Sequence, residues 1–239
     1  AHAFVQHPNR LTSPLIRRNG KLQPAVWAEA LDLVHSRLQE IVTRYGSDSL
    51  MFLSSAKVSN EENYLLMKLA RAGYGTNNID HCARLCHSSS VTGLVETLGS
   101  GAMTNSLDCI DRTDLILVIG SNTTEQHPLI GSRILQAVQP GAKMIVADSR
   151  KIRLSRHADL HLRHHNGTDV ALLNGIMRQI IEDSLEDRDF IEQRTENYAA
   201  LKAALDPCTP QRTAEITGLE PEQIITAARM FGKADNAMI

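Results

Sequence analysis

The sequence predicts an α/β fold, with a parallel, doubly wound (Rossmann-like) sheet flanked by helices and part of a second α/β domain at the N-terminal end. Apolar runs of strand length alternate with segments of helical periodicity along most of the chain. Runs such as "LILVIG" at 115–120 are continuously apolar, which is typical of parallel strands buried on both faces. Polar residues follow these runs directly, where open sheets of this kind bind ligands.

The composition is that of an ordinary globular protein. The 239 residues are 42% hydrophobic and 22% charged, with a net charge of −2. This near-neutral charge argues against general nucleic-acid or membrane-surface binding, and no apolar run approaches the roughly 18 residues that span a bilayer. No signal peptide is visible, and the four cysteines are interpreted as reduced thiols. We therefore expect a cytoplasmic protein with no nucleic-acid partner and no membrane span.

The N-terminal elements are expected in the following order. Asn19-Gly20 predicts a hairpin turn, and apolar residues at helical spacing predict a helix over 27–45. A short apolar run at 49–55 predicts a buried strand. The next helix is expected to begin with Asn60 as its N-cap and to end at Gly73 or Gly75. Residues 1–81 would thus form an extended lead-in and part of one α/β domain.

A second α/β domain is expected over 82–239. Its elements, in order, are a helix at 89–98, a strand at 115–120, a helix beginning at Pro128, a strand in "PGAKMIVADSR", a strand at 158–163, a helix from Asp169, two or three further helices, and the start of a strand in "NAMI".

Two strand ends in this domain carry side chains suited to a nucleotide. Asp148 follows the strand in "VADSRKIR" and could accept hydrogen bonds from a ribose or a base, while Arg150 begins a basic cluster suited to phosphates. A solvated polar surface would have the same appearance. A usual NAD site is weakly supported, because the first turn, "VIGSNTTE", has one glycine and no GxGxxG.

The stretch "NGTDVALLNG" places Gly167 in a turn, Thr168 near an N-cap and Asp169 in the first turn of a helix. This pattern is sufficient for a well-capped helix without further function. Alternatively, an exposed carboxylate at position 169 could pair with the N–H donors of a guanine edge.

The stretch "HCARLCHSSS" holds Cys82 and Cys86. No second Cys/His pair at ligand spacing follows, so it is not a zinc signature, and a reducing compartment disfavours a disulfide. The thiol that precedes the helix would be favoured as a thiolate by the helix dipole and by the nearby Arg84. A nucleophile, a soft-metal ligand and an inert core cysteine remain open, and Cys109 and Cys208 are most simply buried small residues.

Several motifs in the same order resemble one enzyme family. They are "NEENYLLMKLARAGYGTNNIDHCARLCHSSSVTGL", "GSGAMTNSL", "DLILVIGSNTTEQHP", "AKMIVADSRKI" and "GTDVALLNG". Together they closely resemble the catalytic alpha subunits of molybdopterin-dependent formate dehydrogenases, in the dimethyl sulfoxide reductase superfamily. The resemblance extends over nearly the whole chain.

The resemblance implies roles for the residues around the second cysteine. Cys86 matches the cysteine or selenocysteine that ligates molybdenum or tungsten, and His87 matches the histidine that takes the proton from formate. Cys82 would then be a small packing residue. The resemblance also implies that 82–239 binds molybdopterin guanine dinucleotide.

The implied contacts with this cofactor come from both parts of the chain. They are Asn122 and Glu125 near phosphates or ribose, Asp148 and Arg150 at the nucleotide end, Gly167 and Asp169 at the guanine, and Ser55, Lys57 and Asn60 at the pterin.

The implied function is oxidation of formate to CO2, or the reverse, at a bis(molybdopterin guanine dinucleotide) centre. Electrons would pass to partner subunits or to an acceptor such as NAD or ferredoxin, and the full-length subunit would carry a 4Fe–4S cluster outside this segment. The chain is thus expected to be an inactive central fragment. The alternatives are another molybdopterin oxidoreductase, such as a nitrate reductase, and a catalytically inert nucleotide-binding fragment.

Overall fold

A computed structural model describes residues 5–239, and the chain divides into two compact units, Ala1–Ala102 and Met103–Ile239. The sequence placed the boundary after residue 81, whereas the structure groups 82–102 with the first unit. Contacts with the preceding residues explain the difference. The backbone N–H of Ala56 donates to Sγ of Cys82 at 3.3 Å, and Arg84 Nε donates to Asp80 Oδ2 at 2.8 Å.

The first unit contains a hairpin, a two-stranded parallel sheet and several helices. Its elements are β1 (Leu15–Arg18), β2 (Lys21–Pro24), α2 (Trp27–Tyr45), η1 (Ser47–Ser49), β3 (Phe52–Ser54), α3 (Asn60–Lys68), the π-helical turn η2 (Leu69–Gly73), β4 (Ile79–His81), α4 (Ala83–Cys86) and α5 (Ser88–Leu98).

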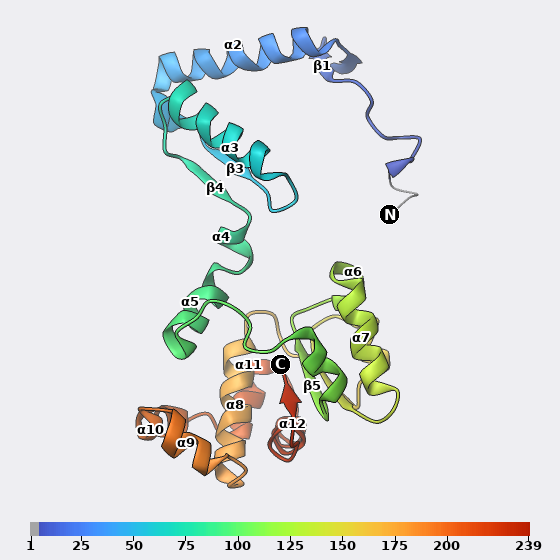
Figure 1. The fold of residues 1–239 in the computed structure, drawn as a ribbon, viewed down its shortest axis with the longest axis vertical. Helices are drawn as coiled ribbons and strands as arrows, with labels where there is room; N and C mark the ends of the chain where they lie inside the picture. Colours follow the sequence, from blue (N-terminus) through green and yellow to red (C-terminus); the bar gives the residue numbers. More distant parts are fainter. Residues whose placement is uncertain (1–4) are drawn as a thin grey trace. The chain divides into compact units, whose positions relative to one another are not determined.

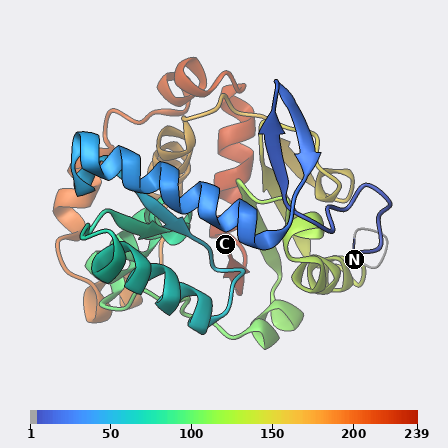
Figure 2. The ribbon, with the colours of Figure 1, turned by 90° about the horizontal axis from the view of Figure 1, so that it is seen from above.

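The hairpin and the long helix are confirmed. Strands β1 and β2 are antiparallel and lie before the start of α2 (Figure 2). Asn19 and Gly20 both have positive φ, 50° and 79°, as a two-residue hairpin turn requires. Helix α2 has the bounds expected from its periodicity.

Helix α3 begins differently from the prediction. Its N-cap is Ser59, and Asn60 is the first helical residue. Ser59 Oγ accepts the N–H of Glu62 at 3.2 Å, and Glu62 Oε2 accepts the N–H of Ser59 at 2.7 Å. This reciprocal capping box satisfies two backbone donors, whereas Asn60 as the cap would have satisfied one.

Strands β3 and β4 form a parallel pair, with Phe52 opposite Ile79 and Ser54 opposite His81 (Figure 1). Because the pair is parallel, the loop after β3 and the segment after β4 leave the sheet at the same edge. Residues 55–59 and Cys82 are therefore neighbours in this unit, joined by the contact between the Ala56 N–H and the Cys82 sulfur.

The second unit holds a four-stranded sheet and its covering helices. Its elements are η3 (Leu107–Arg112), β5 (Leu115–Ile119), α6 (Thr123–Gln126), α7 (Pro128–Val138), β6 (Lys143–Ala147), η4 (Leu154–Arg156), β7 (Leu160–Leu162), α8 (Asp169–Glu182), α9 (Arg188–Arg194), α10 (Tyr198–Leu205), α11 (Pro210–Thr217), α12 (Pro221–Gly232) and β8 (Ala237–Met238).

The strand order is β7-β6-β5-β8, and every adjacent pair is parallel. The chain moves outward from β5 through β6 to β7 and then returns to the other side of β5, as in the first four strands of a Rossmann sheet. The predicted fold class is thus confirmed. The short helix α6 occupies a segment expected to be a loop, and four helices follow α8 where two or three were expected.

Successive strand residues point to opposite faces of the sheet, and helices bury both faces. Helix α7 covers one face, and α8 and α12 cover the other (Figure 1). The strand residues packed with α8 and α12 are Leu115, Leu117, Ile145, Ala147 and Leu162. Those packed on the α7 side are Ile116, Val118, Met144 and Val146. This two-sided burial explains the continuous apolar runs in the sequence.

Two further expectations concern membranes and isolated thiols. Within residues 5–239, no helix combines the length and the hydrophobicity needed to cross a bilayer. Cys109 and Cys208 are half-buried rather than buried: Cys109 lies within η3, and Cys208 lies between α10 and α11.

Candidate functional site

A polar cleft of about 230 Å³ lies beyond the carboxyl ends of β5, β6 and β7. Its lining residues are Gly120, Ala147, Asp148, Ser149, Arg150, His164, Asn166, Gly167 and Asp169. They come from the ends of three neighbouring parallel strands and from the segments that follow them, which is where open α/β sheets bind their ligands. Four of the residues implied by the resemblance are thereby brought together: Asp148, Arg150, Gly167 and Asp169.

Asp148 contributes a buried carboxylate to the lining of this cleft. Its side chain is 5% exposed, and its Oδ1 accepts the backbone N–H of Arg150 at 2.8 Å and the Nε–H of Arg150 at 3.3 Å. Burial acts to raise the pKa of Asp148, but the hydrogen bonds and charge of Arg150 outweigh it and lower the pKa. The carboxylate is therefore held in its ionised form.

Asp169 supplies the second carboxylate. It is the first residue of α8, where the helix dipole favours negative charge, and its side chain is half exposed. Oδ1 of Asp169 lies 3.0 Å from Nε2 of His164, whose ring is almost fully buried. Gly167, two residues before Asp169, has a φ of 81°, a backbone conformation that is strained for a residue with a side chain. The sequence did not single out His164, because one histidine after a short strand carries no motif.

Asn122 and Glu125 lie near the cleft but do not line it. Asn122 is the N-cap position of α6, and Glu125 is exposed on that helix. The hydrogen bond and charge of Asp148 raise the pKa of Arg150, and the charge of Glu125 adds to this effect. Glu125 therefore contributes to the electrostatic environment of the cleft through Arg150.

The remaining predicted residues lie in the first unit, at the carboxyl edge of β3 and β4. Ser55 Oγ accepts the N–H of Lys57 at 3.1 Å, and this turn lies beside Cys82 through the Ala56 N–H. Asn60 is exposed at the start of α3. The segment that bears Cys86 and His87 leaves the same edge.

Cys86 ends α4, and His87 is the N-cap position of α5. Both are exposed, and no described residue makes a side-chain hydrogen bond with either of them. Arg84 is not directed at the thiol of Cys86 as expected, because it forms an ion pair with Asp80. In the described chain Cys82 is not a buried packing residue either: it is exposed, and its sulfur accepts the Ala56 N–H.

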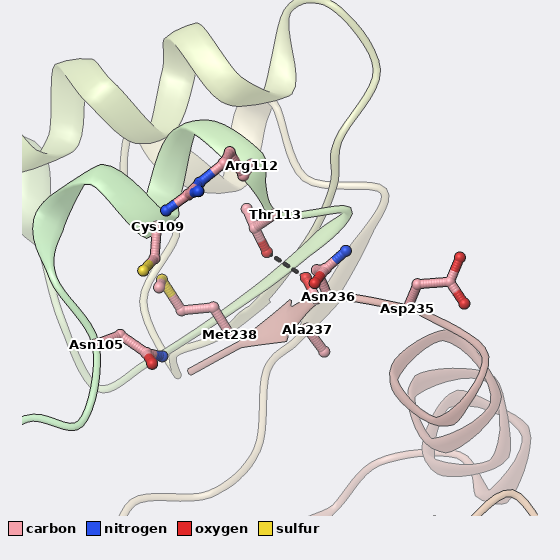
Figure 3. A pocket seen from close by; sticks show the side chains of 8 residues that line it. All are labelled: Asn105, Cys109, Arg112, Thr113, Asp235, Asn236, Ala237 and Met238. Atoms are coloured by element: carbon pink, nitrogen blue, oxygen red, sulfur yellow. Dashed lines mark hydrogen bonds between the residues drawn. The ribbon is translucent and has the colours of Figure 1, made fainter.

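A larger cleft of about 470 Å³ lies at the opposite end of the sheet, where β5 and β8 begin (Figure 3). Thr113 Oγ1 donates to the carbonyl of Asn236 at 2.6 Å and closes one wall. Hydrogen bonding to Ser106 lowers the pKa of the Cys109 thiol, and Arg112 adds to the shift. This cleft does not lie at the carboxyl ends of the strands, and it contains none of the site residues implied by the resemblance.

Comparison with known proteins identifies the family. The family described as "Molybdopterin oxidoreductase" matches residues 10–239. The chain belongs to the molybdopterin oxidoreductase family. Membership implies a molybdopterin cofactor with molybdenum or tungsten.

Two curated relatives and one solved structure define the similarity. The chain is 46% identical over 238 residues to the F420-dependent formate dehydrogenase 1 alpha subunit of Methanococcus maripaludis, covering 100% of this chain and 35% of that protein. It is 42% identical over 236 residues to a nitrate reductase of Symbiobacterium thermophilum, covering 93% and 31%. Acetylene hydratase from Pelobacter acetylenicus shares the fold, with a TM-score of 0.72 and 25% identity over 99% of this chain and 33% of that one. The chain thus spans about a third of the length of these relatives.

The side-chain donors and acceptors of both units are compatible with a molybdopterin cofactor. Within residues 5–239, no group of three or more His, Cys, Asp or Glu side chains could hold a metal ion unaided. A metal carried by a pterin brings ligands with it, so one exposed soft donor such as the Cys86 thiol suffices. The cleft of the second unit offers carboxylates and a guanidinium, which suit the base, ribose and phosphates of a nucleotide.

Proposed function

We propose that this chain is part of the catalytic subunit of an enzyme that oxidises formate to CO2, or catalyses the reverse reaction. The supporting observation is the exposed Cys86–His87 pair, which follows a parallel strand in a chain 46% identical to a formate dehydrogenase alpha subunit. The thiolate of Cys86 is a soft ligand for molybdenum or tungsten. His87 is the next residue along the chain, and it would be the base for a substrate bound at that metal.

The chemistry is divided between the cofactor and the chain. When bound, the metal–pterin group supplies an acceptor for the two electrons of the formate C–H bond. His87 takes the proton released as CO2 forms, a role that typically contributes about 10²–10⁴-fold to a rate. In the reverse direction, the same ring returns the proton.

The cofactor is proposed to be molybdopterin guanine dinucleotide, bound as a pair. The carboxylate of Asp169 would accept the N1–H and N2–H donors of guanine, whereas adenine presents no such pair of adjacent donors. Asp148 and Arg150 would hold the nucleotide end, with Gly167 allowing close approach of the backbone. The further contacts proposed are Asn122 and Glu125 near phosphates or ribose, and Ser55, Lys57 and Asn60 at the pterin.

The remaining parts of the proposal concern the full-length protein. It would carry a 4Fe–4S cluster, lie in the cytoplasm, and pass electrons to partner subunits or to an acceptor such as NAD or ferredoxin. These features follow from the resemblance of the sequence to formate dehydrogenase alpha subunits.

A nitrate reductase is the second candidate, supported by the relative of that name at 42% identity. The histidine directly after the ligand cysteine favours formate, because formate oxidation releases a proton that a neighbouring base must take. The assay is steady-state turnover with formate and a dye acceptor against turnover with nitrate and a reduced dye. Turnover of nitrate alone would reject the formate assignment.

Cofactor analysis tests the enzyme class. The purified full-length protein is expected to contain molybdenum or tungsten and to release a guanine nucleotide on acid hydrolysis. The protein should be produced in a host that takes up the metal and makes the pterin. If it then contains neither, it is a nucleotide-binding module without catalytic activity.

Base preference tests the assignment of Asp169. With its cofactor removed, the full-length protein should bind GDP more tightly than ADP in calorimetry, and Asp169→Asn should remove the preference. Equal affinities in the unaltered protein would contradict guanine recognition at this cleft.

A further inference from the structure

We propose that His164 is a positioning residue for nucleotide recognition: its Nε2–H holds the Asp169 carboxylate in the orientation that reads guanine. The proposal rests on the proposed role of Asp169 and adds the group that makes this carboxylate selective. His164 does not itself touch the base in this assignment.

The ring of His164 is placed rigidly. The residue follows β7, is 4% exposed, and lines the 230 Å³ cleft. Its neighbour His165 donates its backbone N–H to the carbonyl of Thr217 at 2.8 Å, which ties the loop to the end of α11. The imidazole therefore has a fixed position from which to contact α8.

Both ring nitrogens of His164 face acceptor atoms. Nδ1 lies 3.3 Å from the carbonyl oxygen of Leu162, and Nε2 lies 3.0 Å from Oδ1 of Asp169. The shorter contact is with the carboxylate, which can only accept hydrogen bonds and is a stronger acceptor than the carbonyl. Nε2 therefore carries the hydrogen and donates it to Asp169.

His164 is the only described residue whose side chain donates to Asp169. Arg150, the cationic side chain at the cleft, is directed to Asp148 through its backbone N–H and its guanidinium. Each of the two carboxylates in the cleft thus has a donor of its own.

The contact uses one lone pair of Asp169 and leaves the others free. It engages Oδ1, and no described residue donates to Oδ2. A half-exposed aspartate at a helix N-terminus would otherwise rotate among several orientations. With Oδ1 held, Oδ2 and the second lone pair of Oδ1 present two acceptors in a fixed plane, which matches the adjacent N1–H and N2–H of guanine.

Two amide substitutions separate donation from packing. In His164→Gln the amide nitrogen can occupy the place of Nε2 and still donate to Asp169, whereas in His164→Asn it reaches only the place of Nδ1, beside Leu162. Both variants keep a polar side chain at the same backbone position. The measurement is the ratio of GDP to ADP affinity by calorimetry on the full-length protein without its cofactor, with thermal unfolding recorded for each variant.

The expected result is a loss of about tenfold in GDP affinity for His164→Asn, with ADP affinity unchanged and with the preference restored in His164→Gln. In the Asp169→Asn background, His164→Asn should change the ratio no further, because the carboxylate it orients is already absent. This second comparison remains informative if the single His164→Asn variant is unstable.

Three results would overturn the proposal. They are a full guanine preference in folded His164→Asn, an equal loss in folded His164→Asn and His164→Gln, and a further loss in the Asp169→Asn background. If the unaltered protein prefers neither base, guanine recognition by Asp169 is itself rejected and this role of His164 is rejected with it. Selectivity in the unaltered protein that survives His164→Asn would reject the positioning role alone.

Discussion

At the scale of single residues, Cys82 and Cys86 differ in the hydrogen bonds of their sulfur atoms, although only four positions separate them. Cys82 follows β4, and its sulfur accepts the N–H of Ala56. Cys86 lies one helical turn later, next to His87, and no described residue contacts its sulfur by a hydrogen bond. An uncommitted thiol suits the metal-ligand role that we propose for Cys86, and the neighbouring His87 suits the proposed proton transfer.

Substitution of the two cysteines in the full-length protein should therefore have unequal effects. Cys86→Ala should lower formate oxidation by more than about 10³-fold, or roughly 4 kcal/mol in the transition state, because the metal loses its soft ligand. Cys82→Ala removes a weak N–H···S contact and should leave the rate within about tenfold. His87→Ala should keep the metal but lose about 10²–10⁴-fold in turnover. Steady-state rates with metal content measured for each variant test this.

The control is built into the pair, since both substitutions remove one sulfur from the same segment. An active Cys86→Ala enzyme would show that the ligand had been misassigned. So would a folded Cys82→Ala enzyme that had lost both metal and turnover.

Asp148 predicts a dependence of stability on pH. Arg150 keeps the pKa of Asp148 below its ordinary value in the folded chain, so the folded state binds fewer protons there than the unfolded state. Its contribution is fully present above the ordinary aspartate value of about 4 and is lost as pH falls through the lower folded value. Asp148→Asn should lower the free energy of unfolding at pH 7 by about 1–3 kcal/mol and flatten its decline in acid.

Denaturant titrations between neutral and acid pH test this. Asp206→Asn is a suitable comparison, because Asp206 is exposed and receives no side-chain hydrogen bond or ion pair from the described residues. Curves for Asp148→Asn and the unaltered protein that remain parallel in acid would show that Arg150 does not stabilise this carboxylate.

Part of the residue-level site was predictable from sequence. Asp148 and Asp169 follow recognisable patterns, a strand end and a capped helix start, so their place at one edge of the sheet could be anticipated. His164 could not, because its contact with Asp169 depends on the path of the loop between β7 and α8 and on its attachment to Thr217. The direction of Arg84 toward Asp80 depends likewise on local turns that the spacing of the cysteines does not reveal.

At the scale of elements, the contact between α8 and α11 explains why a glycine lies inside a helix. A Cβ at Gly175 would lie 2.7 Å from Cγ2 of Thr213 and closer still to its Oγ1. Thr213 is 2% exposed and cannot move aside without disturbing the core. The absence of a side chain at Gly175 thus sets how closely the two helices approach.

Gly175→Ala should therefore destabilise the chain by about 1–3 kcal/mol, although alanine is intrinsically the better helix former. Thr213→Ala removes the opposing atoms, so the double variant should lose less than the sum of the two single losses. Gly93→Ala in α5 is the matched control, because a Cβ there meets nothing within 4 Å. Unfolding free energies from urea titration decide this, and a Gly175→Ala protein as stable as the parent would contradict it.

Long elements with a strong hydrophobic period could be predicted from the sequence. Helix starts with two candidate caps, and very short helices, could not. Helix α2 matches its apolar spacing because its length gives the pattern many repeats. The start of α3 was misplaced by one residue because Ser59 and Glu62 form a capping box in competition with Asn60. Helix α6 was missed because it has only four residues, too few to show a period.

At the scale of the whole molecule, the proposed chemistry is divided between the two units. The first carries Cys86 and His87, and the second carries the whole cleft with Asp148 and Asp169. The sequence predicted both sets of residues but placed the unit boundary ahead of the cysteines. The order of the motifs in the sequence does not reveal which contacts join residues 82–102 to the preceding sheet.

We also predict that the 239-residue chain alone does not turn over formate. The chain spans about a third of its relatives, so the site that a pair of pterins occupies in the proposed enzyme would be incomplete. Formate-dependent dye reduction should therefore equal the background of the Cys86→Ala chain. Turnover proportional to protein concentration, in material free of host enzyme, would contradict this.

Nucleotide recognition, by contrast, should survive removal of the first unit. Every residue that lines the cleft lies in 103–239, and both apolar clusters around the four-stranded sheet are built from residues of that unit alone. Residues 103–239 produced alone should therefore fold and bind GDP with a Kd within about threefold of the 239-residue chain, a difference of roughly 0.7 kcal/mol. Asp169→Asn in the shortened chain should remove the preference for GDP over ADP. Calorimetry on both lengths, with circular dichroism to establish folding, tests this. A folded 103–239 that binds neither nucleotide, beside a longer chain that binds GDP, would show that the first unit contributes to the nucleotide site.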